Sequence, residues 1–182
     1  MSDFGIIGIG RIGTSMARNM SSNGIIVSLY DKSHNSLDNL KNDYPELDSS
    51  LVFDDINKFI SSISKPRKVL ILVPSGPALD EVISLLIQHL DSNDILIDGG
   101  NTNPNVSFEN HQTIKSKNLL YLGMGVSGGV KGVLDGPSMM IGGDANAFDQ
   151  VKNIFSQITS KTINDSKSFE YFGESNQGHF LK

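Results

Sequence analysis

Cysteine is absent from the 182-residue sequence, which excludes disulfides, thiolate nucleophiles and cysteine-bound metals. Long apolar runs are also missing, and none reaches the ~18 residues that a membrane-spanning helix needs. Basic clusters are missing as well, and the formal net charge of −5 argues against nucleic acid as a partner. Because no basic segment precedes the first apolar stretch, a signal peptide is not expected. We therefore expect a soluble, cytoplasmic protein that binds no membrane, no nucleic acid and no metal.

Strand-like and helix-like segments alternate along the chain. Such alternation predicts an α/β fold of Rossmann type, a doubly wound and mostly parallel sheet with helices on both faces. Apolar runs predict strands over Asp3–Gly8, Ile25–Tyr30, Val69–Val73, Ile95–Asp98, Leu119–Val126 and Met139–Ile141. Helices are expected after the first strand, near Ser36–Asn42, and over Asp54–Ile63, Leu79–Ile87, Ser107–Lys117 and Ala145–Ile158.

The most informative motif is Gly-Ile-Gly-Arg-Ile-Gly, which begins at Gly8 directly after an apolar run. Gly8 would make the tight turn, Gly10 would let the backbone approach a pyrophosphate, and Gly13 would let the helix pack close to the strand. The helix N-terminus then presents unpaired N–H groups to the phosphates. The predicted cofactor loop comprises Gly8, Gly10, Arg11, Ile12 and Gly13. The alternative is a glycine turn in an ordinary strand–helix unit.

An acid at the end of the second predicted strand supports the cofactor interpretation. Asp31 follows the motif by about 20 residues, where dinucleotide-binding domains hold a ribose hydroxyl. Its carboxylate would accept from the 2′-hydroxyl of NAD and repel the 2′-phosphate of NADP. The basic side chain of Lys32, which precedes Ser33, would partly offset that repulsion. The sequence therefore predicts NAD or NADP as cofactor, bound by Asp31, Lys32 and Ser33, with NAD slightly favoured.

Three further loops follow predicted strands, at the edge where doubly wound sheets bind ligands. They are Val73–Gly76, Asp98–Thr102 and Gly125–Gly129. The third supplies successive backbone N–H groups and a hydroxyl, which suit a carboxylate or a phosphate. A glycine-rich turn needed only for backbone conformation explains this loop equally well when it is taken alone.

The C-terminal segment begins a helix that the sequence does not complete. The residues from Glu174 to Gln177 are typical of a helix start, Phe180 begins an apolar face, and the chain stops at Lys182. A helix of two turns is marginal in isolation. We therefore expect residues 1–174 to form the dinucleotide-binding domain and residues 175–182 to be the cut start of a further helix.

Together these loops resemble one family, the 6-phosphogluconate dehydrogenases. Val126–Gly129, followed by Gly132 and Gly136–Met140, resembles the family's substrate-binding signature. Asp98–Asn101 resembles its DGGN loop, and Gly178–Lys182 resembles its GHFVK segment. The GxGxxG and SGG motifs occur across the wider β-hydroxyacid dehydrogenase superfamily, whereas DGGN, GPSMM and GHFLK select the phosphogluconate branch.

The resemblance implies an enzyme of the pentose phosphate pathway. Such an enzyme oxidises 6-phosphogluconate at C3 by hydride transfer to a nicotinamide and then decarboxylates the 3-keto acid to ribulose 5-phosphate. By match, Lys182 is the catalytic base that takes the 3-hydroxyl proton, and Asn101 lies near both substrate and nicotinamide. The implied substrate-binding residues are Asn101, Ser127, Gly128 and Gly129, and Val73, Pro74 and Asn101 join the implied cofactor contacts.

Two side chains near the C-terminus have a plainer interpretation when the resemblance is set aside. Lys182 is then a terminal surface lysine, and His179 is expected to be structural, buried against the sheet. A catalytic lysine must be neutral before it takes a proton, so its pKa must be lowered by burial or by neighbouring charge.

The sequence also departs from the family. Its members continue into a large all-helical domain that supplies an acid, phosphate contacts and the usual homodimer surface, and this domain is absent here. We therefore expect the chain alone to bind cofactor with little or no turnover. Typical NADP-dependent members have Asn-Arg-Thr where this chain has Asp31–Ser33, and a lysine where it has Pro74. The alternatives are a hydroxyisobutyrate-type dehydrogenase and a non-catalytic dinucleotide-binding module.

Overall fold

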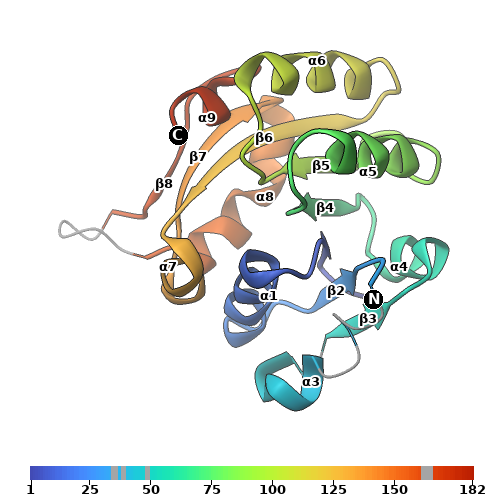
Figure 1. Ribbon diagram of the computed structural model, residues 1–182. Helices are drawn as coiled ribbons and strands as arrows, with labels where there is room; N and C mark the ends of the chain where they lie inside the picture. The colour runs from blue at the N-terminus through green and yellow to red at the C-terminus, as the bar shows by residue number, and fades with distance from the viewer. Residues whose placement is uncertain (34–36, 38–39, 48–49, 161–165) are drawn as a thin grey trace.

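The chain folds around one mixed β-sheet (Figure 1). The computed structural model describes residues 1–33, 37, 40–47, 50–160 and 166–182. The strands lie in the order β3-β2-β1-β4-β5-β6-β7-β8. They are β1 Phe4–Ile7, β2 Val27–Tyr30, β3 Leu51–Phe53, β4 Lys68–Ile71, β5 Ile95–Asp98, β6 Leu120–Ser127, β7 Ser138–Gly143 and β8 Phe169–Tyr171. Every pairing from β3 to β6 is parallel, β7 is antiparallel to β6, and β8 is parallel to β7.

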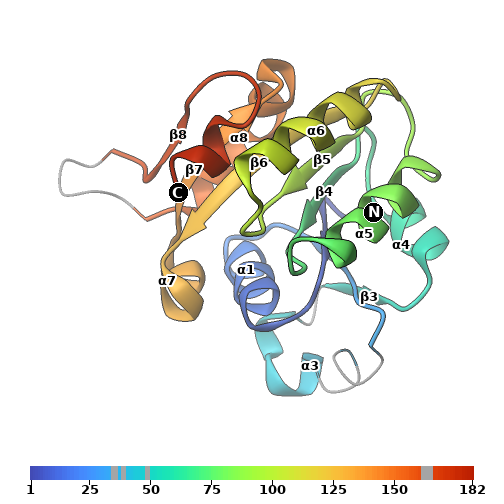
Figure 2. The same cartoon turned by 45° about the horizontal axis from the view of Figure 1, so that its top comes forward.

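Helices cover both faces of this sheet (Figures 1 and 2). One face carries α1 (Arg11–Ser22) and α8 (Ala145–Ile158), and the other carries α4 (Ile56–Ser62), α5 (Pro77–Ile87) and α6 (Pro104–Lys115). The short helices are α3 (Leu40–Asp43), α7 (Gly129–Asp135) and α9 (Gln177–Phe180), with a 3-10 turn, η1, at Pro45–Leu47. The predicted Rossmann-type α/β fold is confirmed.

The chain changes direction across the sheet between β1 and β4, which lie side by side. From β1 the sheet is extended on one side by β2 and β3, and on the other side by β4, β5 and β6. In doubly wound folds this switch point opens a crevice at the carboxyl ends of the strands, where ligands bind. The fold therefore places its ligand crevice where β1 ends at Ile7 and β4 ends at Ile71.

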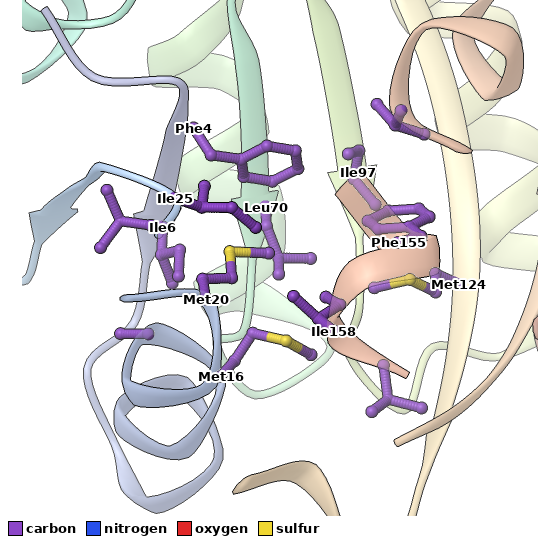
Figure 3. Packing of buried hydrophobic residues seen from close by; sticks show 14 of the residues in the cluster. Phe4, Ile6, Met16, Met20, Ile25, Leu70, Ile97, Met124, Phe155 and Ile158 are labelled. Carbon is purple, nitrogen blue, oxygen red and sulfur yellow. The ribbon is translucent and has the colours of Figure 1, made fainter. Parts of the chain in front are cut away.

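The core beneath this crevice is packed with side chains from α1, α8 and the central strands (Figure 3). Met16 and Met20 of α1 are fully buried, as is Leu70 of β4. Phe4 of β1 packs against Phe155 of α8 with 6.3 Å between ring centroids. This packing holds α1, and with it the start of the helix after the glycine motif, against the sheet.

A buried amide side chain ties three helices together at the edge of this core. Asn19 of α1 is 3% exposed, and its Nδ2 donates to the carbonyl oxygens of Val133 and Ile158, each at 2.8 Å. Its Oδ1 accepts from Nδ2 of Asn23 at 2.9 Å. Since Val133 belongs to α7 and Ile158 ends α8, both helices are fixed to the helix that follows the cofactor loop.

The observed elements differ from the sequence predictions mainly where the elements are short. The bounds of β5 and α8 are as predicted, and most others differ by at most three residues at an end. The sequence missed β3 and β8, which have three residues each and no buried residue, and the glycine-rich α7. The predicted helix near Ser36–Asn42 falls largely outside the described residues.

The predicted start of the last helix, at Glu174, is wrong. Helix α9 begins at Gln177, because the backbone of Ser175 has a φ of +72°, which no α-helix accommodates. Among the described residues, no helix combines the length and the apolarity needed to cross a bilayer.

Candidate active site

The glycine motif forms the turn between β1 and α1, and the close contacts there explain its spacing. Gly8 has a φ of +94°, and a Cβ on it would lie 2.8 Å from the carbonyl oxygen of Leu72. A Cβ on Gly13 would lie 1.9 Å from the carbonyl oxygen of Gly8, so α1 packs directly on the turn. At Gly10 a Cβ would meet open space. The loop therefore leaves the N-terminus of α1 open to a phosphate group, as the cofactor needs.

Asp31 follows β2, and backbone amides fix its carboxylate. Oδ2 accepts from the amide of Ile9 at 2.8 Å, and Oδ1 accepts from the amide of Ser33 at 2.9 Å. Asp31 lines a groove of about 380 Å³ together with Gly8, Gly10, Tyr30, Lys32, Val73 and Pro74. Lys32 is paired with Glu81 of α5, which lies in the same groove. The groove thus presents a fixed carboxylate and a lysine that already has an acidic partner.

A second and larger cleft, of about 840 Å³, also borders the glycine motif, at Gly10, Arg11 and Ile12. It is lined by residues of the β1–α1, β4–α5, β5–α6 and β6–α7 connections, by residues of α1 and α7, and by Lys182, which follows α9. They include Gly10, Arg11, Ile12, Val73, Pro74, Asn101, Ser127, Gly128, Gly129 and Lys182. The three loops that the sequence placed at the carboxyl edge of the sheet therefore meet in one cleft.

Lys182 and Asn101 meet inside this cleft although 81 positions separate them in the chain. Lys182 Nζ donates a hydrogen bond to Asn101 Oδ1. Lys182 is exposed as a residue, but partial burial lowers the pKa of its amine, against the opposing effect of the Asp98 carboxylate. A lowered pKa increases the neutral fraction of the amine, which is the form that accepts a proton.

Glycines in the sheet allow α9, and hence Lys182, to approach so closely. A Cβ on Gly178 of α9 would lie 2.1 Å from the carbonyl oxygen of Gly123 in β6. A Cβ on Gly125 would lie 2.8 Å from Cβ of Lys182 and 2.8 Å from the carbonyl oxygen of Gly178. Gly123 and Gly125 lie two positions apart on one strand, so they share a face of the sheet. That spacing of two is a signal in the sequence that could have indicated a close approach, but the predictions did not use it.

The Ser127–Gly129 loop has a conformation that only glycine adopts readily. Gly128 has a φ of +130° and Gly129 a φ of +60°. A Cβ on Gly128 would also lie 3.0 Å from Cα of Gly132 in α7. Backbone conformation alone thus accounts for the glycines at these positions. Their place in the cleft is also the one that binding of an anion by their amides requires. The cleft is also lined by Ser75, Gly100 and Val126, which belong to the predicted loops and motifs but were not predicted as binding residues.

His179 is buried, as expected, and it lies beneath the cleft. Its Nδ1 lies 2.9 Å from Oγ of Ser107, and its Nε2 lies 4.0 Å from Oδ2 of Asp98. Burial lowers the pKa of His179, the Asp98 carboxylate opposes this shift, and the positive charge of Lys182 reinforces it. The imidazole of α9 therefore lies against Ser107 of α6 and the start of the DGGN loop, and its lowered pKa favours the neutral form.

The fold and the open phosphate loop define a dinucleotide-binding domain. Residues 3–168 match the family model described as the NAD binding domain of 6-phosphogluconate dehydrogenase. The chain belongs to this family, which confirms the resemblance seen in the sequence and gives a nicotinamide dinucleotide as its cofactor.

Several curated relatives share this assignment. The decarboxylating 6-phosphogluconate dehydrogenase of Staphylococcus epidermidis is 36% identical over 178 residues, which cover 98% of this chain and 38% of that protein. The Saccharomyces cerevisiae enzyme, 6-phosphogluconate dehydrogenase, decarboxylating 1, is 34% identical over 181 residues and matches over 37% of its length. The chain therefore spans less than two fifths of the length of these relatives.

Solved structures support the same fold. Plasmodium falciparum 6-phosphogluconate dehydrogenase, solved in apo form and with NADP+ or 6-phosphogluconate, superposes with a TM-score of 0.93 at 33% identity. The match covers 98% of this chain and 38% of that one. A 3-hydroxyisobutyrate dehydrogenase of Mycobacterium tuberculosis has a TM-score of 0.82 at 18% identity, covering 100% of this chain and 57% of that one. The second likeness shows the shared fold alone.

Proposed function

We propose that this chain supplies the cofactor site and part of the substrate site for the oxidative decarboxylation of 6-phosphogluconate to ribulose 5-phosphate. The observation that carries the proposal is the contact between Lys182 and Asn101 in the cleft that also contains the Ser127–Gly129 loop and the glycine motif. The family membership and the relatives of known name support it. Gly8, Gly10, Arg11, Ile12 and Gly13 would hold the dinucleotide phosphates, and Asp31, Lys32, Ser33, Val73 and Pro74 its adenosine half.

In the proposed reaction, Lys182 acts on the 3-hydroxyl of the substrate. Neutral Lys182 Nζ would take the proton of the hydroxyl as C3 becomes a carbonyl, and a bound nicotinamide would supply the acceptor for the hydride that leaves C3. The lowered pKa of Lys182 increases the fraction of neutral amine that is available to take this proton. The resulting 3-keto acid loses its C1 carboxylate as carbon dioxide, and the electron pair left behind forms an enediol, which is protonated to ribulose 5-phosphate.

The other cleft residues would hold the substrate in place. The Ser127 hydroxyl and the amides of Gly128 and Gly129 are hydrogen-bond donors suited to a carboxylate. Asn101 offers an amide nitrogen to the substrate while its oxygen accepts from Lys182. Such positioning matters because a small displacement of reacting groups lowers a rate by about 100-fold.

The substrate assignment is tested by calorimetric titration of the NAD-saturated chain with 6-phosphogluconate. We expect binding that Asn101→Ala weakens by about tenfold, the equivalent of one lost polar contact. Asn105→Ala, which removes the same amide from the exposed start of α6, is the matched control and should bind like the original chain.

Different results identify the two alternatives. Binding of 3-hydroxyisobutyrate without 6-phosphogluconate would replace our proposal with a hydroxyisobutyrate-type dehydrogenase. Binding of the dinucleotide with neither acid would favour a module that does not turn over substrate. A full-length enzyme would add the helical domain of the family, as a homodimer, and we expect most of the turnover to require it.

For the cofactor, we propose a preference for NAD over NADP. The fixed Asp31 carboxylate would repel a 2′-phosphate by about 1–3 kcal/mol, and Lys32 offsets little of this while it is paired with Glu81. Titration with both cofactors should show NAD binding about tenfold tighter. Asp31→Asn should shift the preference toward NADP.

The Lys32–Glu81 pair offers a second way to change this preference. Glu81→Gln should free Lys32 and strengthen NADP binding with little change for NAD. Asp80→Asn removes an equal charge from the neighbouring exposed position of α5 and should leave both affinities unchanged. NADP binding at least about tenfold tighter than NAD in the unaltered chain would refute the assigned role of Asp31.

A further inference from the structure

Four polar side chains from four different elements meet beneath the cleft. They are Asp98 at the end of β5, Ser107 in α6, Tyr121 in β6 and His179 in α9. The first three are 0% exposed and His179 is 6% exposed. Burial of so many polar groups is costly unless they satisfy one another, whereas apolar side chains would fill the same space without that cost.

Short distances connect these groups into one chain. The Tyr121 hydroxyl lies 3.0 Å from Oγ of Ser107 and 3.4 Å from Oδ2 of Asp98. Oγ of Ser107 lies 2.9 Å from Nδ1 of His179, whose Nε2 faces Oδ2 of Asp98 at 4.0 Å. Nε2 is therefore beyond hydrogen-bond distance of this carboxylate. A neutral imidazole with its hydrogen on Nδ1 donates to Ser107, whose hydroxyl then donates to Tyr121, whose hydroxyl donates to Asp98. The four side chains thus form one hydrogen-bonded chain that runs from His179 through Ser107 and Tyr121 to Asp98.

The sheet leaves room for these side chains at one glycine. Gly123 of β6 is paired with Asp98 of β5 in the register of the sheet. A Cβ on Gly123 would lie 2.8 Å from Oγ of Ser107 and 3.0 Å from Nδ1 of His179. Any other residue at this position would therefore push the side chains of Ser107 and His179 out of this arrangement.

Both ends of this chain of side chains, Asp98 and His179, lead to the cleft. Oδ1 of Asp98 accepts from the amide of Gly100 at 3.0 Å, which fixes the loop that carries Asn101. His179 lies three positions before Lys182, whose Nζ donates to Asn101 Oδ1. The same four buried groups therefore hold both partners of the Lys182–Asn101 contact.

We propose that Tyr121, Ser107, His179 and Asp98 form a positioning relay that holds Lys182 against Asn101. The role of the relay in catalysis rests on the proposed function, in which Lys182 is the base. The role of the relay in holding Lys182 in place does not rest on the proposed function, because all the contacts lie within this chain. His179, Ser107 and Tyr121 are positioning residues, since they act on the cleft through Lys182 and the Asp98–Asn101 loop.

The test measures the titration of Lys182 in the whole chain, by trace acylation with acetic anhydride over a pH series and mass spectrometry of the C-terminal peptide. Ser107→Ala severs His179 from Tyr121. We expect its Lys182 midpoint to move upward toward that of an ordinary lysine, with about threefold slower acylation at pH 8. Ser62→Ala is the matched control, because it removes a helical serine hydroxyl that hydrogen-bonds Ser28, remote from the cleft, and should leave Lys182 unchanged.

A second pair of variants keeps the test decisive if Ser107→Ala does not fold. Tyr121→Phe removes only the relay hydroxyl, whereas Tyr171→Phe removes a hydroxyl that donates to the carbonyl of Gly143 at 2.7 Å. We expect Tyr121→Phe alone to shift the Lys182 titration. An unchanged Lys182 in Tyr121→Phe, or equal shifts in the two tyrosine variants, would overturn the relay.

Titration with 6-phosphogluconate separates this inference from the proposed function. A chain that does not bind 6-phosphogluconate but shows the Tyr121-dependent shift refutes the substrate and supports the relay. A chain that binds 6-phosphogluconate and shows no such shift refutes the relay and supports the substrate.

Discussion

Replacement of Gly178 by alanine is expected to displace α9 from the sheet and to separate Lys182 from Asn101. The added Cβ would lie 2.1 Å from the carbonyl oxygen of Gly123, 2.6 Å from that of Met140 and 2.8 Å from the amide nitrogen of Gly142. These are backbone atoms of two paired strands, so no side-chain rotation relieves the contact. Overpacking of this kind costs about 1–3 kcal/mol, which lowers Tm by about 2–12 °C in a domain of this size.

The displacement should be local as well as destabilising. Hydrogen exchange should accelerate in α9, and the Lys182 pKa should return toward its ordinary value as the amine becomes solvated. Gly132→Ala is the matched control, because a Cβ there meets nothing within 4 Å and the residue lies inside α7. Unchanged exchange in α9 of the Gly178→Ala variant would show that the close approach of helix and sheet does not hold Lys182.

Replacement of Gly13 by alanine is expected to abolish dinucleotide binding. The added Cβ would lie 1.9 Å from the carbonyl oxygen of Gly8, so α1 or the turn must move. The turn is held in place, because Gly8 has a φ of +94° and lies against the backbone of Leu72. We expect NAD affinity to fall by at least about 100-fold, measured by calorimetry, together with a lower Tm.

Gly10→Ala separates the two effects at the same loop. A Cβ at Gly10 meets open space, so this variant should keep its Tm. It should nevertheless bind NAD more weakly, because the methyl group would occupy the space through which the backbone approaches the pyrophosphate. If Gly10→Ala binds NAD as well as the original chain, the phosphates do not lie at this loop.

The sequence predicted the parts of the fold that local patterns determine. Short sequence patterns were enough for three of these parts. The glycine motif indicated a strand–turn–helix unit, the acid after β2 indicated a ribose site, and the apolar run of β5 indicated a buried strand. Helix α8 had a clear apolar stripe and a polar opposite face, and its predicted bounds agree with the structure. Because ligands bind at the carboxyl ends of the strands in doubly wound sheets, three loops were predicted to lie together, and they do line one cleft.

The parts that were missed depend on tertiary contacts. Strands β3 and β8 have only three residues each and no buried residue, so their sequences are too short to indicate a strand, and pairing with a neighbouring strand defines them. Helix α7 contains two glycines, which lower helix propensity, and contacts with α1 stabilise it. The place of Lys182 was given only by resemblance, because its approach to Asn101 depends on glycines in β6 that no local rule connects with the C-terminus.

The amide of Asn19 makes one position of α1 unusually intolerant of substitution. A primary amide carries two hydrogens on one nitrogen, and here each goes to the end of a different helix, at Val133 and at Ile158. Aspartate has the shape but no hydrogen to donate, leucine has neither donor nor acceptor, and glutamine places its amide one carbon farther out. Among the genetically encoded residues, asparagine alone combines a side chain of this length with two hydrogens on one nitrogen for the two carbonyl oxygens. A library randomised at this position should therefore return asparagine under selection for folding, even though residue 19 touches neither cofactor groove nor cleft.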